Sequence, residues 1–122
     1  MTVETETTAL ANAIVAYALT FPEAWEDDPW GSTTIKVRKK GFMFSGLSEE
    51  EVFTFSVKLK ETGLDVLELE NAEPTHYGLG KHGWVTVRYE PGSTWDVDEI
   101  KGWVDQSYRA VAPKTLVKKL LT

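Results

Sequence analysis

The pattern of apolar and polar positions begins with a helical period. Leu10, Ile14 and Phe21 lie among apolar positions three and four residues apart. Pro22 then ends the segment, because a residue before proline is pushed out of the helical region. The spacing predicts a helix over residues 5–20.

The period then changes to two, which is typical of strands. Residues 34–38 alternate, and Lys40-Gly41 reads as a hairpin turn into residues 42–45. Residues 53–60 form the clearest strand, and residues 84–89 form another. One face of the 53–60 strand is apolar and the other is polar, so we expect an antiparallel sheet with one covered face and one wet face. The apolar positions of that strand are Phe53, Phe55, Val57 and Leu59.

A short acidic helix is predicted over residues 63–71, capped by Thr62, with Leu64 and Leu67 inward and Val66 as a further candidate. Pro74 closes this segment.

Asp96 and Glu99 have the spacing of a capping box for the next helix, whose core positions include Ile100, Trp103, Val104, Tyr108 and Val111. Pro113 is well placed to start a last short helix. Strands in runs, rather than alternating with helices, predict an α+β fold: a two-layer antiparallel β-sheet flanked by helices.

Composition bounds the class of protein. A chain of 122 residues is expected to form one domain over residues 1–122, and the absence of cysteine excludes disulfides and thiolate chemistry. No signal peptide or membrane span is recognisable, so we expect a cytoplasmic monomer that does not engage a membrane. The net charge of −6 counts against non-specific nucleic-acid binding, although clustered acids and bases predict a polarised molecule.

Familiar catalytic and cofactor motifs are missing. Gly78-x-Gly80-x-x-Gly83 matches the dinucleotide fingerprint formally, but a strand follows it where the fingerprint needs a helix. The interpretation that we favour is a sharply bent loop. We therefore predict no cofactor, no catalytic residue and no enzyme activity, while noting that carboxylate pairs formed in space leave no trace in sequence.

The remaining polar clusters have simple interpretations. His76 and His82, with Glu73, do not have a standard zinc spacing, so we predict no metal site and treat them as surface or loop-anchoring groups. Residues 26–28 read as a solvated charge run rather than a catalytic cluster.

The wet face of the predicted sheet is more informative. It gathers five bases without an acid, beside one tryptophan, and a basic sheet with an exposed aromatic is one way to hold phosphates and stack a base. Two alternatives stay open: lysines that discourage edge-to-edge association, and a tryptophan buried beneath the C-terminal helix. The candidate binding residues are Lys36, Arg38, Lys58, Lys60, Arg88 and Trp84.

Several motifs together resemble the MmcQ/YjbR-like family over nearly the whole chain. They include Phe21-Pro22, the Pro29-Trp30-Gly31 step, residues 41–44, Lys81-His82-Gly83-Trp84 and Trp103-x-x-x-Ser107-Tyr108. The resemblance implies a bacterial-type α+β protein compared with secretion chaperones and labelled as DNA-binding, with a double-wing arrangement of hairpins. It supplies no catalytic residues. The motif positions that it carries onto this chain are the loop residues Tyr77, Gly78, Lys81, His82 and Gly83, with Trp84 at the start of the strand that follows.

Three functions follow as hypotheses. The leading one is a non-catalytic module that binds nucleic acid. The second is a protein-interaction or chaperone-like adaptor, which exposed apolar surface at residues 42–44 or at Trp25 and Trp30 would favour. The third is a small-molecule site around Tyr77, Lys81, His82 and Trp84.

Overall fold

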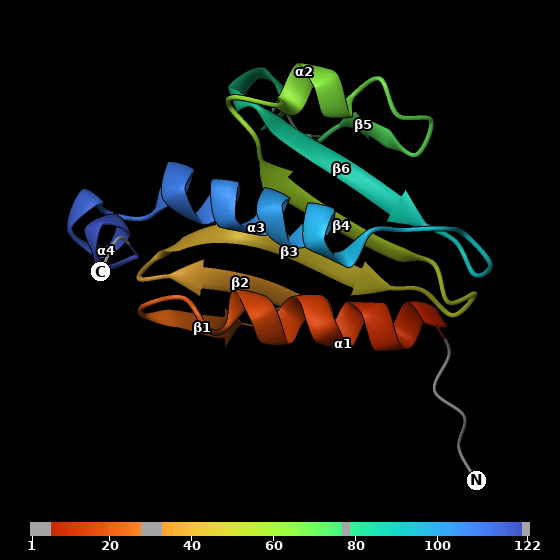
Figure 1. Cartoon of the computed structure of the whole chain (residues 1–122), viewed down its shortest axis with the longest axis horizontal. Coiled ribbons are helices and arrows are strands. Elements are labelled where there is room, and N and C mark those ends of the chain that lie inside the picture. The colour runs from red at the N-terminus through yellow and green to blue at the C-terminus, as the bar shows by residue number, and fades with distance from the viewer. Residues whose placement is uncertain (1–5, 28–32, 77–78, 121–122) are drawn as a thin grey trace, which may run out of the picture.

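Two long helices lie across one face of a single sheet (Figure 1). The structure is a computed structural model that describes residues 6–27, 33–76 and 79–120. In chain order its elements are α1 (Glu6–Ala18), β1 (Ala24–Asp27), β2 (Thr33–Val37), β3 (Lys40–Leu47), β4 (Phe53–Lys58), α2 (Gly63–Val66), β5 (Ala72–Pro74), the 3₁₀ helix η2 (Leu79–His82), β6 (Trp84–Tyr89), α3 (Val97–Val111) and α4 (Lys114–Lys119).

The sheet is antiparallel throughout, with the strand order β1-β2-β3-β4-β6-β5. Helices α1 and α3 pack on one of its faces, and the predicted two-layer α+β fold is confirmed. We call the face without these helices the open face. Its existence follows from the alternation in β4 and β6, where every second side chain points away from the core.

The core lies between the sheet and the two helices. Phe55, Val57 and Val87 are fully buried there, as the alternation predicts. In β3 the pairing skips one residue, because Ile35 opposes Met43 whereas Lys36 opposes Gly41. A bulge of this kind turns two successive side chains to the same side, and both Phe42 and Met43 are fully buried.

The acidic helix differs from its prediction. Helix α2 covers only Gly63–Val66, and Thr62 makes no side-chain capping bond. Its hydroxyl instead donates to Gln106 Oε1 of α3 at 3.2 Å. Val66 is buried, but Leu64 is 84% exposed, so the expectation that Leu64 points inward is wrong. A segment this short makes too few turns for helical spacing to decide which side chains are buried.

The hairpin turn and the edges of the sheet also differ from the sequence prediction. The turn occupies Arg38 and Lys39, and β3 already begins at Lys40, two residues before the predicted strand. The edge strands β1 and β5 were not anticipated, since both are short and carry acids. The predicted cap at the N-terminus of α3 is confirmed: Asp96 Oδ1 accepts from the amides of Asp98 at 3.0 Å and Glu99 at 3.3 Å.

No helix in residues 6–27, 33–76 and 79–120 combines the length and the apolar character needed to cross a membrane.

Candidate functional site

Trp84 lies on the open face, as its parity predicts, but it is not an exposed platform. The side chain is only 7% exposed and does not belong to the core cluster beneath the helices. Its ring packs against Phe44 with centroids 5.2 Å apart, and its register partner on β4 is Lys58. The alternative of burial beneath the C-terminal helix is therefore wrong, and neighbours on the open face bury this ring.

Lys36 also lies on the open face, and an acid accompanies it. Its Nζ is 2.7 Å from Asp27 Oδ2 on β1 and sits over the ring of Trp25, 5.3 Å from the centroid. At the opposite edge of the sheet, Glu73 of β5 opposes Thr86 of β6 and therefore also lies on the open face. The expectation of a face without acids is wrong, because the two unpredicted edge strands each bring one.

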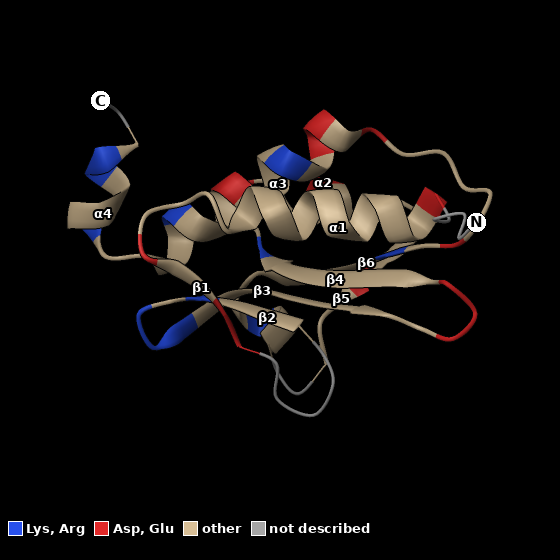
Figure 2. Cartoon of the chain, turned by 90° about the horizontal axis from the view of Figure 1, so that it is seen from below, with Lys and Arg blue, Asp and Glu red and all other residues tan. Residues whose placement is uncertain are grey.

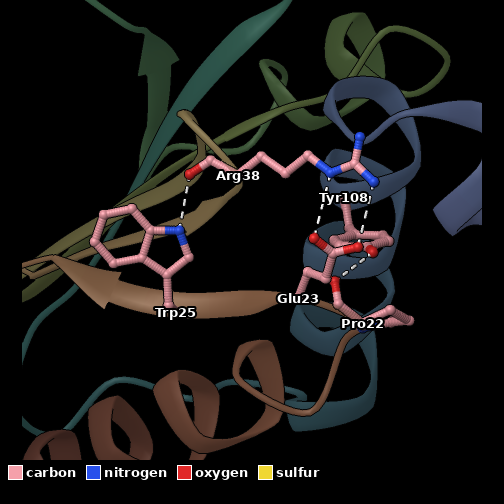
Figure 3. Close-up of polar contacts among 5 residues, drawn as sticks. All are labelled: Pro22, Glu23, Trp25, Arg38 and Tyr108. Atoms are coloured by element: carbon pink, nitrogen blue, oxygen red, sulfur yellow. Dashed lines mark hydrogen bonds and ion pairs between the residues drawn. The ribbon is translucent and has the colours of Figure 1, made fainter.

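Arg38 is held in the turn after β2 rather than on the open face (Figure 3). Its Nε and Nη2 donate to the Glu23 carboxylate, each at 3.3 Å, and its carbonyl accepts from Trp25 Nε1 at 2.8 Å. Both Arg38 and Glu23 have φ near +57°. The hydrogen bond from Arg38 lowers the pKa of the Glu23 carboxyl, and the same bond raises the pKa of the guanidinium. Arg38 therefore ties β1 to the hairpin turn.

Lys60 and Arg88 lie at opposite ends of the sheet. Lys60 follows the end of β4 and lines a hollow against α3 with Asp105 and Arg109. Arg88 is exposed on the open face, but at the opposite end of β6, where it lines a hollow of about 290 Å³ together with three carboxylates. Those carboxylates belong to Glu70, Glu73 and Glu90. The six predicted binding residues thus do not form one patch.

A different basic surface emerges from the topology. In an antiparallel sheet the end of one strand meets the start of its neighbour, so the ends of β2 and β4 and the starts of β3 and β6 share one rim. Helix α4 lies at the same end of the molecule (Figure 1). We call this surface the basic rim, and its residues are Arg38, Lys39, Lys40, Lys58, Lys60, Lys81, Lys114, Lys118 and Lys119.

The opposite rim of the sheet is acidic. It contains the β3–β4 turn, the approach to β5 and the connection from β6 to α3. Figure 2 shows the contrast: blue marks the β2–β3 turn and α4 at one end, and red marks the connections at the other. The acids of this rim are Glu49, Glu50, Glu51, Glu70, Glu90, Asp96 and Asp98.

Positive charges crowd one another on the basic rim. Burial lowers the pKa of Lys58, and the charges of Lys60 and Lys40 lower it further. A bound anion would relieve that repulsion. On the other flank of the hairpin, Lys39, Lys40 and Lys114 line a hollow of about 490 Å³. The turn therefore joins the lysines of β4 to those of α4.

The glycine loop has a structural explanation. Gly83 has φ +89°, and its carbonyl accepts from the Leu59 amide at 2.8 Å. A Cβ on Gly80 would come within 2.9 Å of Pro74 Cβ. Strand β6 follows directly, which agrees with a bent loop rather than a dinucleotide site. Lys81 and His82 are exposed on η2, whereas Tyr77 and Gly78, like Trp30, lie outside the described residues.

The two histidines do not share a site in the described part of the chain. His76 Nε2 lies 3.6 Å from Glu73 Oε1, and both side chains are well exposed. No group of three His, Asp or Glu side chains suited to a metal ion occurs among residues 6–27, 33–76 and 79–120.

Ser107 and Tyr108 of α3 explain the most specific helical motif. Ser107 Oγ donates to the Phe42 carbonyl and accepts from the Lys58 amide at 2.8 Å. Tyr108 Oη donates to the Pro22 carbonyl at 2.7 Å, and its ring stacks on Phe21 at 4.6 Å between centroids. Ser107 holds α3 to the sheet, and Tyr108 holds α3 to the connection between α1 and β1. The motif is therefore structural.

The apolar surface that would favour an adaptor is smaller than predicted. Phe42 and Met43 are fully buried, which leaves Phe44 at 37% exposure and Trp25 at 43%. Both are on the open face, Phe44 through its contact with Trp84 and Trp25 through its pairing with Lys36. The sequence predicts Trp84 as the exposed aromatic ring, whereas the structure exposes Phe44 and Trp25.

These features define an α+β protein with one open sheet face and a polarised pair of rims. The YjbR family model matches residues 19–110, and the chain belongs to this family. A crystal structure of the Deinococcus radiodurans protein DR2400, described with the domain DUF419, has the same fold, with a TM-score of 0.71 at 20% identity over 90% of this chain and 86% of that one. No curated protein sequence matches the chain.

Proposed function

We propose that this chain is a non-catalytic module that binds nucleic acid through the basic rim. One observation carries the proposal: nine of the 13 lysines and arginines lie on that rim, although the molecule has a net charge of −6. Proteins bind phosphate backbones largely by neutralising them with such side chains. The acidic rim would repel the same ligand, so only one orientation is favourable.

The β2–β3 hairpin supports the proposal. Arg38 is already paired with the Glu23 carboxylate. Lys39 and Lys40 are exposed at the tip of the hairpin, and neither takes part in the ion pairs Lys36–Asp27, Arg38–Glu23, His76–Glu73 and Arg109–Asp105. In the double-wing arrangement that the family resemblance implies, this hairpin serves as a wing. Its two lysines are then the first groups to meet a phosphate backbone.

A charge-reversal pair tests the proposal. We expect the Lys39→Glu/Lys40→Glu variant to bind short single- or double-stranded oligonucleotides at least about tenfold more weakly than the unmodified chain at low salt, because two phosphate contacts become repulsive. Fluorescence anisotropy with labelled oligonucleotides measures the change.

The matched control is Arg88→Glu/Lys101→Glu. Each replacement in either variant exchanges one positive for one negative charge, so both variants reach a net charge of −10 from −6. Arg88 and Lys101 lie outside the basic rim, and this control is expected to keep most of the affinity. Equal losses in both variants would attribute binding to net charge alone, and no binding to either oligonucleotide form by the unmodified chain would overturn the proposal.

A further inference from the structure

Two partly exposed aromatic rings lie on the part of the open face next to the basic rim. Trp25 pairs with Lys36, and Lys36 pairs with Gly41, which directly follows Lys40 of the rim. The ring of Phe44 reaches back over Gly41, since a Cβ at Gly41 would be 3.1 Å from Phe44 Cζ. Both rings therefore lie beside the lysines rather than beside the acidic rim.

The surroundings of each ring fix its position. Phe44 rests on Trp84 at 5.2 Å between centroids, and that tryptophan is itself buried. Trp25 is anchored by the bond from its Nε1 to the Arg38 carbonyl at 2.8 Å and by Lys36 over its ring. Aromatic rings that are held before binding lose little conformational entropy when a ligand stacks on them.

We propose that the open face takes single-stranded nucleic acid, with unpaired bases stacking on Phe44 and Trp25 while phosphates run along the basic rim. This inference rests on the proposed function and names its substrate class. Duplex bases are already stacked on one another, so they cannot reach these rings without unpairing. Single-strand binding proteins combine a basic track with aromatic side chains in this way. In this arrangement the buried Trp84 packs against Phe44 and does not itself stack on the ligand.

The experiment compares an oligothymidylate of about 12 nucleotides with a duplex of the same length, a span within the roughly 4–16 nucleotides that an OB-fold single-strand binding domain covers. The unmodified chain is expected to bind the single strand more tightly. Phe44→Leu and Trp25→Leu are each expected to weaken single-strand binding about tenfold, because a stacked base is lost, and to leave duplex binding within about twofold. Phe44→Tyr keeps a ring and should bind as the unmodified chain does.

Two controls separate this inference from the proposed function. Leu64→Ala removes an exposed apolar side chain from α2, which lies on the same side of the sheet as α1 and α3 and so opposite the open face (Figure 2), and should change neither affinity. Lys39→Glu/Lys40→Glu should weaken the binding of both the single strand and the duplex.

The outcomes separate the two proposals. If Lys39→Glu/Lys40→Glu weakens binding while Phe44→Leu and Trp25→Leu change nothing, or if the duplex binds more tightly than the single strand, the stacking inference fails and binding by the basic rim stands. If neither form binds, both proposals fail. Circular dichroism and urea unfolding confirm that each variant is folded.

Discussion

At the scale of single residues, buried polar groups join elements that lie far apart in the sequence. The Ser107 hydroxyl sits between β3 and β4 beside the bulge, where it bonds to the Phe42 carbonyl and the Lys58 amide. Both backbone groups would lose these bonds without it. An unsatisfied buried group costs more than the net gain from a typical hydrogen bond, so this residue contributes strongly to stability.

We therefore expect Ser107→Ala to lower the free energy of unfolding by about 1–3 kcal/mol. Urea unfolding followed by circular dichroism measures the change. Ser93→Ala is the matched control, because Ser93 is exposed and its replacement should stay within about 0.5 kcal/mol. Equal effects from both replacements would contradict the bridging role.

A second prediction at the residue scale concerns Tyr89 and the stability of the protein at alkaline pH. Burial, together with the nearby Glu99 carboxylate, raises the pKa of its phenol to about 12. The phenol of the unfolded chain ionises near pH 10, so deprotonation favours unfolding above that pH. Stability should hold below pH 10 and fall between pH 10 and 12.

The Tyr89→Phe variant checks the assignment through the unfolding midpoint as a function of pH. Tyr17 and Tyr108 also have raised pKa values, so the variant should lose only part of the alkaline decline. An unchanged decline from pH 10 upward would show that Tyr89 does not contribute.

At the scale of elements, the connection from η2 to β6 depends on one backbone conformation. Gly83 has a positive φ, and its carbonyl closes the sheet rim by accepting from Leu59 of the β4 segment. A side chain at that φ meets its own backbone, which is why glycine occupies the position. Gly102, in the middle of α3, has no such requirement, since a Cβ there would contact nothing within 4 Å.

These two glycines should respond in opposite directions. We expect Gly83→Ala to destabilise the protein by about 1–2 kcal/mol. Gly102→Ala should stabilise it by up to about 1 kcal/mol, because alanine is the better helix former. Thermal unfolding midpoints report both changes, and a stabilising Gly83→Ala would be inconsistent with the strained turn.

The long elements could be predicted from sequence, and the reason is their periodicity. Strand β6 and the start of α3 agree with the prediction because five or more residues repeat one pattern and a cap or turn marks the boundary. The short edge strands β1 and β5 have only four and three residues, too few to show a period. Their acids, Asp27 and Glu73, are what changed the charge of the open face.

The candidate site was harder to predict than the fold. Parity placed Trp84 on the correct face, but exposure depends on neighbours such as Phe44, and the bulge after Gly41 shifted the parity of β3. Arg38 looked like a strand residue by alternation, yet its φ near +57° puts it in the turn. Local spacing carries no information about such contacts between strands.

At the scale of the whole molecule, the charge distribution follows from the antiparallel topology. Successive connections alternate between the two rims, so bases in one set of turns and acids in the other give a polarised molecule. Net charge alone therefore describes this protein poorly. The functional proposal depends on the position of the bases and predicts a strong dependence of binding on salt.

The salt dependence of oligonucleotide binding tests the central claim most directly. The slope of the logarithm of the binding constant against the logarithm of salt concentration counts the phosphates that the protein neutralises. For Lys39→Glu/Lys40→Glu we predict a slope about two units shallower than for the unmodified chain, roughly one per lysine, with no comparable change for Arg88→Glu/Lys101→Glu. Slopes that are equal for all three proteins would contradict the assignment of binding to the basic rim.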